Sequence, residues 1–179
     1  MKYLLTISFL LIITSSFAQN LFKGKGHVSF ISEAPLEIIE GDSDDLTGIV
    51  DLSTLNFAFK LNVSSFEGFN SPLQKEHFNE HYLETTKYPE AYFLGSILLQ
   101  EDCSNGCDTE AICKGKFTIH GITQIVTIPI VFNLDKSDLR ISGDFTIKLS
   151  DYNIKIPKIV HAKIASEIEV NVEILMNKD

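Results

Sequence analysis

The sequence predicts an all-β protein of about eight antiparallel strands, with two short helical segments beside them. Three observations support this fold class. Apolar and polar residues alternate with a period of two over most of the chain, as they do in strands with one buried face. The breaks between these segments are short and rich in Asp, Asn, Ser and Gly. Only two segments carry helical spacing, so the pattern favours a sandwich or a closed barrel, and closure has the advantage of removing exposed strand edges.

Eight segments carry the strand pattern. In the clearest of them, apolar side chains at every second residue form one face and polar side chains form the other. Six such segments cover residues 55–63, 91–97, 116–120, 126–134, 139–149 and 167–174, and two shorter strands are expected at 26–32 and 36–40. We therefore expect a sheet with one apolar surface and one polar surface.

Turns are expected where polar and small residues interrupt the alternation. Such runs occur at 41–45, which is rich in Asp, at 104–106 and at 135–138. Gly121 ends the strand that finishes with His120. The chain shows no internal repeat, linker or low-complexity tract, so one domain is expected.

The first helical segment begins at Ser71. This residue is a natural N-cap, Pro72 suits the first helical position, and Gln74 completes a capping-box pattern. The residues expected to share one face of the helix are Leu73, His77, Phe78 and His81. A second helical segment is expected at 157–165, with its apolar side chains against the sheet. Such segments would cover the ends of a barrel or flank its mouth.

The first eighteen residues have the layout of a secretory signal peptide. Lys2 supplies a positive charge, residues 4–13 are mostly apolar, and the small residues Ser16 and Ala18 precede an expected cleavage site before Gln19. The apolar stretch of about ten residues is too short to span a bilayer comfortably, so cleavage is favoured over a retained anchor. The sequence thus predicts residues 1–18 as a signal peptide cleaved after Ala18. Residues 19–179 are expected to form a single domain of a periplasmic or secreted protein.

The mature chain is acidic. Cleavage removes Lys2 and no acidic residue, so the net charge of −9 for the whole chain becomes −10 for residues 19–179. A negative surface argues against nucleic acid as a partner, because the phosphates would repel it. It also argues against docking on anionic lipid headgroups by charge alone. No segment after residue 18 is long and apolar enough for a transmembrane helix, so an integral membrane protein is not expected.

All three cysteines lie in one loop. An exported location permits a disulfide between one pair of Cys103, Cys107 and Cys113, and the sequence does not indicate which pair. The spacing fits no common zinc pattern, and no histidine lies inside the loop. A covalent staple of the loop is therefore favoured over a metal site.

The apolar face of the strands is the first candidate for function. The chain contains thirteen Phe and no Trp. For any single ring, packing in a core is the usual role. An eight-stranded barrel can nevertheless hold one ligand in its interior. The pattern leaves open a solidly packed barrel, which would be a structural or interaction module, and a hollow barrel that binds an apolar molecule.

Two histidines on the first helix are the second candidate. His77 and His81 are four residues apart and are flanked by Glu76 and Glu80. This spacing can place two imidazoles on one metal ion, which would allow a metal-assisted enzyme. The sequence fixes no third ligand, and the alternative is a pair of polar helix residues. We assign no metal site and no catalytic residue, because the chain also lacks a nucleophile elbow, a calcium loop and a glycine-rich phosphate motif.

Three motifs resemble those of the YceI-like family. The first, at 76–89, contains Glu-His-Phe-Asn, Tyr-Leu-Glu-Thr and Lys-Tyr-Pro in that order. The second, at 115–129, begins with Gly-Lys-Phe-Thr-Ile-His-Gly, and the third, at 143–157, contains Gly-Asp-Phe-Thr-Ile followed by Ser-Asp-Tyr-Asn. The three motifs span most of the mature chain in the order of the family. The insert at 101–112 departs from the family in its length and its cysteine content.

The resemblance implies a lipocalin-like, eight-stranded antiparallel barrel with short flanking helices. It also implies an elongated apolar cavity that holds a polyisoprenoid or an isoprenoid-quinone-like lipid. The expected function is non-enzymatic binding or carriage of this lipid; no cofactor is required, and a homodimer is allowed. The expected ligand contacts, inside the barrel and at its mouth, are Phe57, Phe59, Leu61, Phe69, Phe78, Phe93, Phe117, Ile128, Ile130, Phe132, Phe145, Ile147 and Tyr152.

Overall fold

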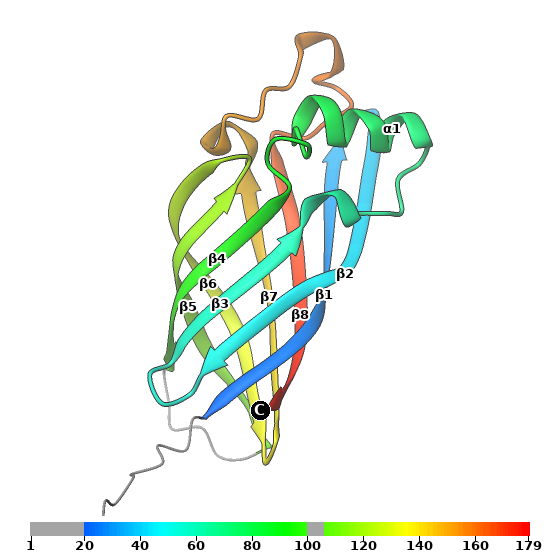
Figure 1. Ribbon diagram of the computed structural model, residues 1–179. Helices are drawn as coiled ribbons and strands as arrows, with labels where there is room; N and C mark the ends of the chain where they lie inside the picture. Colours follow the sequence, from blue (N-terminus) through cyan, green and yellow to red (C-terminus); the bar gives the residue numbers. More distant parts are fainter. Residues whose placement is uncertain (1–19, 100–105) are drawn as a thin grey trace, which may run out of the picture.

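Eight antiparallel strands form one closed barrel in the computed structural model, which describes residues 20–99 and 106–179 (Figure 1). The order around the barrel follows the order along the chain, and β1 closes it by pairing with β8. The predicted fold class, an all-β eight-stranded antiparallel barrel with short flanking helices, is confirmed. The strands are β1 (Leu21–Ala34), β2 (Glu37–Asp51), β3 (Asn56–Asn62), β4 (Glu90–Leu99), β5 (Asp108–Ile119), β6 (Ile122–Asp135), β7 (Asp138–Lys148) and β8 (Glu167–Lys178).

The two ends of the barrel differ. The helical segments gather at one end, which we call the helix end, while β1 begins and β8 finishes at the other (Figure 1). The helical segments are η1 (Val63–Ser65), α1 (Pro72–His77), η2 (Phe78–Tyr82), η3 (Leu149–Tyr152) and η4 (Lys158–Val160). No helix within the described residues is long and apolar enough to cross a bilayer.

The expected turn at 41–45 is wrong, because these residues lie in the middle of β2. The prediction of two short strands at 26–32 and 36–40 therefore underestimates both β1 and β2. The aspartates of the run are exposed, whereas Ser43 is buried and its hydroxyl lies 2.5 Å from that of Ser65. A strand can carry an acidic run when its charged side chains alternate with small buried ones. A bulge between Gly26 and Val28 of β1 absorbs the break in register.

The first helical segment is confirmed. The Ser71 hydroxyl accepts a hydrogen bond from the Gln74 amide at 3.2 Å. The Gln74 side chain accepts from the amide of Asn70 at 2.9 Å, one residue earlier than in a standard capping box. Leu73 does not share a buried face with Phe78: it is 57% exposed, while Phe78 packs against the core.

The second expected helix at 157–165 is wrong in extent. Only Lys158–Val160 forms a single 3-10 turn, and the rest of the segment is irregular. Ile159 is 91% exposed and does not face the sheet. The segment is held by the turn between β1 and β2, because the Leu36 amide donates to the carbonyl of Ala162 at 2.8 Å. This tertiary contact accompanies short internal turns, such as the hydrogen bond from the Lys163 amide to the Val160 carbonyl at 2.8 Å.

The end of the barrel opposite the helices is filled by side chains, and we call it the packed end. Large residues from several strands are almost completely buried there. They include Phe22, Val50, Phe57, Ile97, Phe132, Leu139 and Met176. The packed end therefore holds the strands together, and space for a ligand can lie only in the middle or at the helix end of the barrel.

Candidate apolar binding site

The middle of the barrel contains an apolar cavity. The volume of this cavity is about 130 Å³. Every strand of the barrel contributes to the lining, because period-two alternation directs one face of each strand inward. The lining includes Val28, Leu46, Phe59, Leu61, Phe93, Cys113, Phe117, Ile128, Ile130, Ile141, Phe145, Val172 and Ile174.

A second apolar space lies under the helices. Its volume is about 130 Å³, and it adjoins the first space. The residues that line both spaces are Val63, Phe66, Ile119, Ile147 and Val170. Along β8 the two linings run from Ile168 to Ile174, which corresponds to roughly 20 Å at a rise of about 3.3 Å per residue. Together the spaces form an elongated volume suited to a long, slender molecule.

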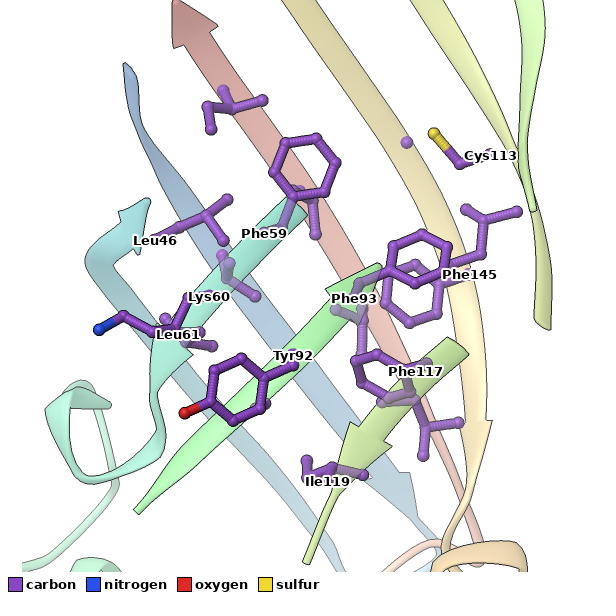
Figure 2. Close-up of a pocket in the computed structure, with 18 of the residues that line it drawn as sticks. Leu46, Phe59, Lys60, Leu61, Tyr92, Phe93, Cys113, Phe117, Ile119 and Phe145 are labelled. Atoms are coloured by element: carbon purple, nitrogen blue, oxygen red, sulfur yellow. The ribbon is translucent and has the colours of Figure 1, made fainter. Parts of the chain in front are cut away.

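Aromatic rings form much of the wall. Under the helices, Phe78 stacks on Phe30 with centroids 5.7 Å apart and lies 5.0 Å from Phe69. In the middle of the barrel, the rings of Phe93, Phe117 and Phe145 lie close together (Figure 2). Edge-to-face ring arrangements of this kind are favourable and leave flat apolar surfaces facing the cavity.

Several polar side chains that line the two spaces have partners within the protein. Lys60 and Tyr92 touch the cavity, but their polar ends point away from it (Figure 2) and both contact Glu90. In the space under the helices, the Ser32 hydroxyl accepts from the Ala165 amide at 2.9 Å, and Gln74 is bonded at both side-chain polar atoms. Among the described residues, no fully buried side-chain nitrogen or oxygen atom lacks a hydrogen-bond partner, and the inner surface is mainly apolar.

Among the titratable side chains that touch the middle cavity, Cys113 is the buried one. It is 2% exposed, and burial raises the pKa of its thiol to about 12. The pKa rises because an apolar surrounding disfavours the thiolate. Cys113 therefore behaves as a small apolar residue of the lining rather than as a nucleophile.

The structure divides the expected ligand contacts into three groups. Those that line the middle cavity are Phe59, Leu61, Phe93, Phe117, Ile128, Ile130, Phe145 and Ile147, and Ile147 also reaches the helix end. Phe69 and Phe78 line only the space under the helices. Phe57 and Phe132 belong to the packed end and line neither space. Tyr152 is 4% exposed and lies outside both spaces, against Phe117.

Sequence reasoning missed part of the lining. It emphasised aromatic residues and left out aliphatic ones on the same inward faces, such as Val170, Val172 and Ile174 of β8. It also omitted Phe30 and Phe66 at the helix end. The alternation along β8 carried the signal for the aliphatic residues, whereas Phe66 lies outside any strand and had no periodic signal.

Residues of the family-like motifs meet in a cluster that we call the helix-end clasp, formed by Glu84, Tyr88, His120 and Tyr152. The ring nitrogens of His120 lie 2.8 Å from a Glu84 carboxylate oxygen and 2.9 Å from the Tyr152 carbonyl oxygen. Tyr88 packs edge-on against His120, with centroids 4.9 Å apart. Gly121 has φ +72°, and a Cβ there would lie 2.5 Å from the Tyr88 ring. The clasp ties the segment after η2 to the β5–β6 turn and to η3.

His77 and His81 lie side by side on the helix, with ring centroids 5.3 Å apart. No third metal-binding side chain joins them among residues 20–99 and 106–179. The metal-assisted alternative therefore rests only on the four-residue spacing of His77 and His81, because the described residues add no third ligand.

Cys107 is exposed, Cys113 is buried, and both are free thiols. These two candidates are therefore not bonded to each other. Cys103, like the expected signal peptide at 1–18, lies outside the described residues. The expectation that all three cysteines share one loop is wrong, because Cys113 lies within β5 and faces the cavity. Cys107 and Cys113, the cysteines within residues 20–99 and 106–179, give no support for a disulfide staple.

Comparison with known proteins agrees with this geometry. Residues 21–176 match the sequence profile of the YceI-like domain. No curated protein sequence matches the chain significantly. A polyisoprenoid binding domain from Saccharophagus degradans, implicated in plant cell wall breakdown, superposes with a TM-score of 0.76 at 12% identity and covers 90% of this chain and 99% of its own.

Two further solved structures share the fold. BcnA of Burkholderia cenocepacia has a TM-score of 0.69 at 19% identity, over 84% of this chain and 95% of its own. The YCEI protein of Campylobacter jejuni has a TM-score of 0.60 at 17% identity, over 79% of this chain and 85% of its own. The profile match covers nearly the whole barrel, from β1 to β8. The chain therefore belongs to the YceI-like family.

Proposed function

We propose that this protein binds an isoprenoid-type lipid, a polyisoprenoid or an isoprenoid quinone, in the interior of its barrel without changing it chemically. The observation that carries the proposal is the elongated apolar volume that runs from the helices into the middle of the barrel. The polyisoprenoid-binding domain that shares the fold supports the choice of ligand class.

The physical chemistry of the interior favours such a ligand. A lining of aliphatic and aromatic side chains in water is unfavourable unless an apolar molecule covers it, and each Å² so covered contributes about 25 cal/mol. A branched polyprenyl chain is slender enough for the elongated space and has few polar atoms. A polar or compact ligand would find no unpaired hydrogen-bonding partner in the described lining.

The binding is proposed to be non-enzymatic and to require no cofactor. The titratable side chain buried in the described wall of the cavity is Cys113, and its raised pKa keeps the thiol protonated at neutral pH. The wall therefore supplies contact area and shape. The proposed role is to shield an apolar chain from water during storage or carriage.

The proposed location is the periplasm or the cell exterior, after cleavage following Ala18. The support is the pattern of a charged start, an apolar stretch and small residues in the first eighteen positions. A water-filled compartment is where a prenyl chain most needs a protein shield, because its free solubility there is very low.

Mass spectrometry of the protein purified from its native compartment tests both proposals together. Under native conditions we expect the processed protein, beginning at Gln19, with one bound lipid. After organic extraction we expect the bare polypeptide and a separate prenyl-type lipid. Protein that is free of lipid and also binds no prenyl lipid when offered one would contradict the proposed function. An unprocessed mass would contradict the proposed cleavage.

A further inference from the structure

The seam between β6 and β7 is incomplete. These strands are paired only from Val131 to Asp135 on β6 and from Asp138 to Ser142 on β7, next to their connecting turn. In contrast, β7 stays paired with β8 from Asp138 to Lys148. Residues 122–130 and 143–148 therefore face each other without a backbone ladder. We call this stretch the β6–β7 slit.

Two residues mark the point where the ladder stops. Pro129 has no amide hydrogen, so it cannot donate to a neighbouring strand. Gly143 directly follows the last paired residue of β7, Ser142, and a Cβ there would lie only 3.0 Å from the Pro129 carbonyl oxygen. The strands approach closely at this point, and no ladder pair follows it toward the helix end.

The slit lies directly beside the central cavity. An outer groove along it is bordered by Thr127, Asp144, Thr146 and their neighbours. The side chains that line both this groove and the cavity are Phe117, Ile128, Phe145 and Ile147. A single layer of side chains therefore separates the cavity from the outside along the slit, with no hydrogen-bonded backbone across it.

The helix end of the slit is fixed. The Gln124 side-chain amide donates to the Asp151 carbonyl oxygen at 2.9 Å, and Tyr152 packs edge-on against Phe117 at 5.6 Å. Tyr152 is also part of the helix-end clasp through its carbonyl oxygen. Opening of the slit therefore requires rotation of the wall side chains, while η3 stays in place.

The other routes into the cavity need larger changes. The packed end is filled by side chains such as Phe132, Leu139 and Met176, whose exposed fractions are 1% or less. The helix end is covered by α1 and η2. Phe78 of η2 packs against three other Phe rings, and the segment that follows η2 belongs to the helix-end clasp. Rotating a few half-buried side chains is faster than unfolding either end.

We propose that the β6–β7 slit is the portal through which an apolar chain enters and leaves the cavity. The ligand class is the slender prenyl chain of the proposed function, on which this inference rests. Phe117, Phe145 and Ile128 form the gate, and the polar border of Thr127, Asp144 and Thr146 faces water outside it.

A cross-link across the slit tests the proposal. Thr127→Cys and Thr146→Cys, two exposed positions on opposite sides, are joined by a short cleavable bis-maleimide in a Cys103→Ser/Cys107→Ser background. The matched control joins Thr146→Cys to Glu169→Cys, because these residues are already paired across the complete β7–β8 ladder. Stopped-flow fluorescence then follows uptake and release of a farnesyl chain that carries a fluorophore.

A cross-linked portal changes rates and leaves affinity unchanged. We expect uptake and release both to slow by about tenfold or more, with the same Kd, and to recover when the cross-link is cleaved. The control cross-link should alter neither rate. Rates within about twofold of the uncross-linked protein would overturn the portal while leaving the proposed function intact. Failure of the uncross-linked protein to bind the probe would overturn the proposed function and the portal with it.

Discussion

The buried thiol of Cys113 gives a direct test of whether the barrel interior is dry. Its pKa is raised from 9.0 to about 12 by burial in the cavity wall. At pH 8 about one tenth of an ordinary thiol with a pKa of 9 is thiolate, and the fraction for Cys113 is about a thousandfold lower. Because alkylation requires the thiolate, the native thiol should react at least about a thousandfold more slowly than an exposed one.

Two single-thiol proteins make the comparison clean. Cys103→Ser/Cys107→Ser retains only Cys113, and Cys103→Ser/Cys113→Ala retains only the exposed Cys107. Reaction with iodoacetamide at pH 8 is followed by intact mass. Labelling of Cys113 within about tenfold of Cys107 would refute the reasoning, because it would mean that water and reagent reach the cavity freely. Denaturation should abolish the difference and serves as the control for intrinsic reactivity.

The same pKa predicts a dependence of stability on pH. Above pH 9 the unfolded chain ionises this thiol while the native protein keeps its proton, so the native state binds more protons and stability falls as pH rises. The loss reaches about 2 kcal/mol at pH 10.5, at about 1.4 kcal/mol per pH unit. The comparison is urea unfolding of the Cys103→Ser/Cys107→Ser protein with and without Cys113→Ala between pH 7 and 10.5. Parallel curves for the two proteins would contradict the burial of the thiol.

Two further predictions use matched pairs of substitutions. Gly121→Ala should lower the free energy of unfolding more than Gly106→Ala does, by about 1–3 kcal/mol. Both glycines have positive φ, but only the Cβ added at 121 meets a ring, that of Tyr88. If urea unfolding showed equal losses of stability for the two variants, the destabilisation would come from the backbone conformation alone. Val172→Lys should weaken binding of a fluorescent prenyl probe by about 100-fold or more, because it puts a charge into the apolar cavity. Glu173→Lys, on the outer face of the same strand, should leave the Kd within about twofold, and equal affinities for the two variants would argue against the cavity as the binding site.

The helix-end clasp explains why the family-like motifs are recognisable in the sequence. Glu84, Tyr88 and His120 lie in two different motifs, yet their side chains meet beside Gly121. Their chemistry is demanding, because a buried imidazole needs partners at both nitrogens and the turn needs a residue without a Cβ. Glu84, Tyr88 and His120 of these motifs therefore hold the helical cover in place. Other motif residues, such as Phe117 and Phe145, line the ligand space.

The sequence by itself predicted the fold class and the first helix. Alternation along the strands of the barrel and the Ser71 cap are local patterns, and local patterns are set by the period of the backbone and by neighbouring residues. The alternation also assigned most of the inward-facing rings, such as Phe59, Phe93 and Phe117. The acidic run at 41–45 misled the local reading, because the turn propensity of Asp and Gly was overridden by pairing with β1.

Only the tertiary structure decided that the barrel is hollow in one part and packed in another. Phe57 and Phe59 belong to the same apolar face of β3, yet Phe57 fills the packed end and Phe59 lines the cavity. Phe57 and Phe59 differ because the other strands place different side chains beside them at the two levels of the barrel. The alternation within β3 carries no information about these neighbours. The β6–β7 slit has the same origin, since it arises where the pairing of the two strands stops at Val131 and Ser142. Closure of the barrel brings together residues far apart in the chain, and it is this closure that creates the cavity and its boundary.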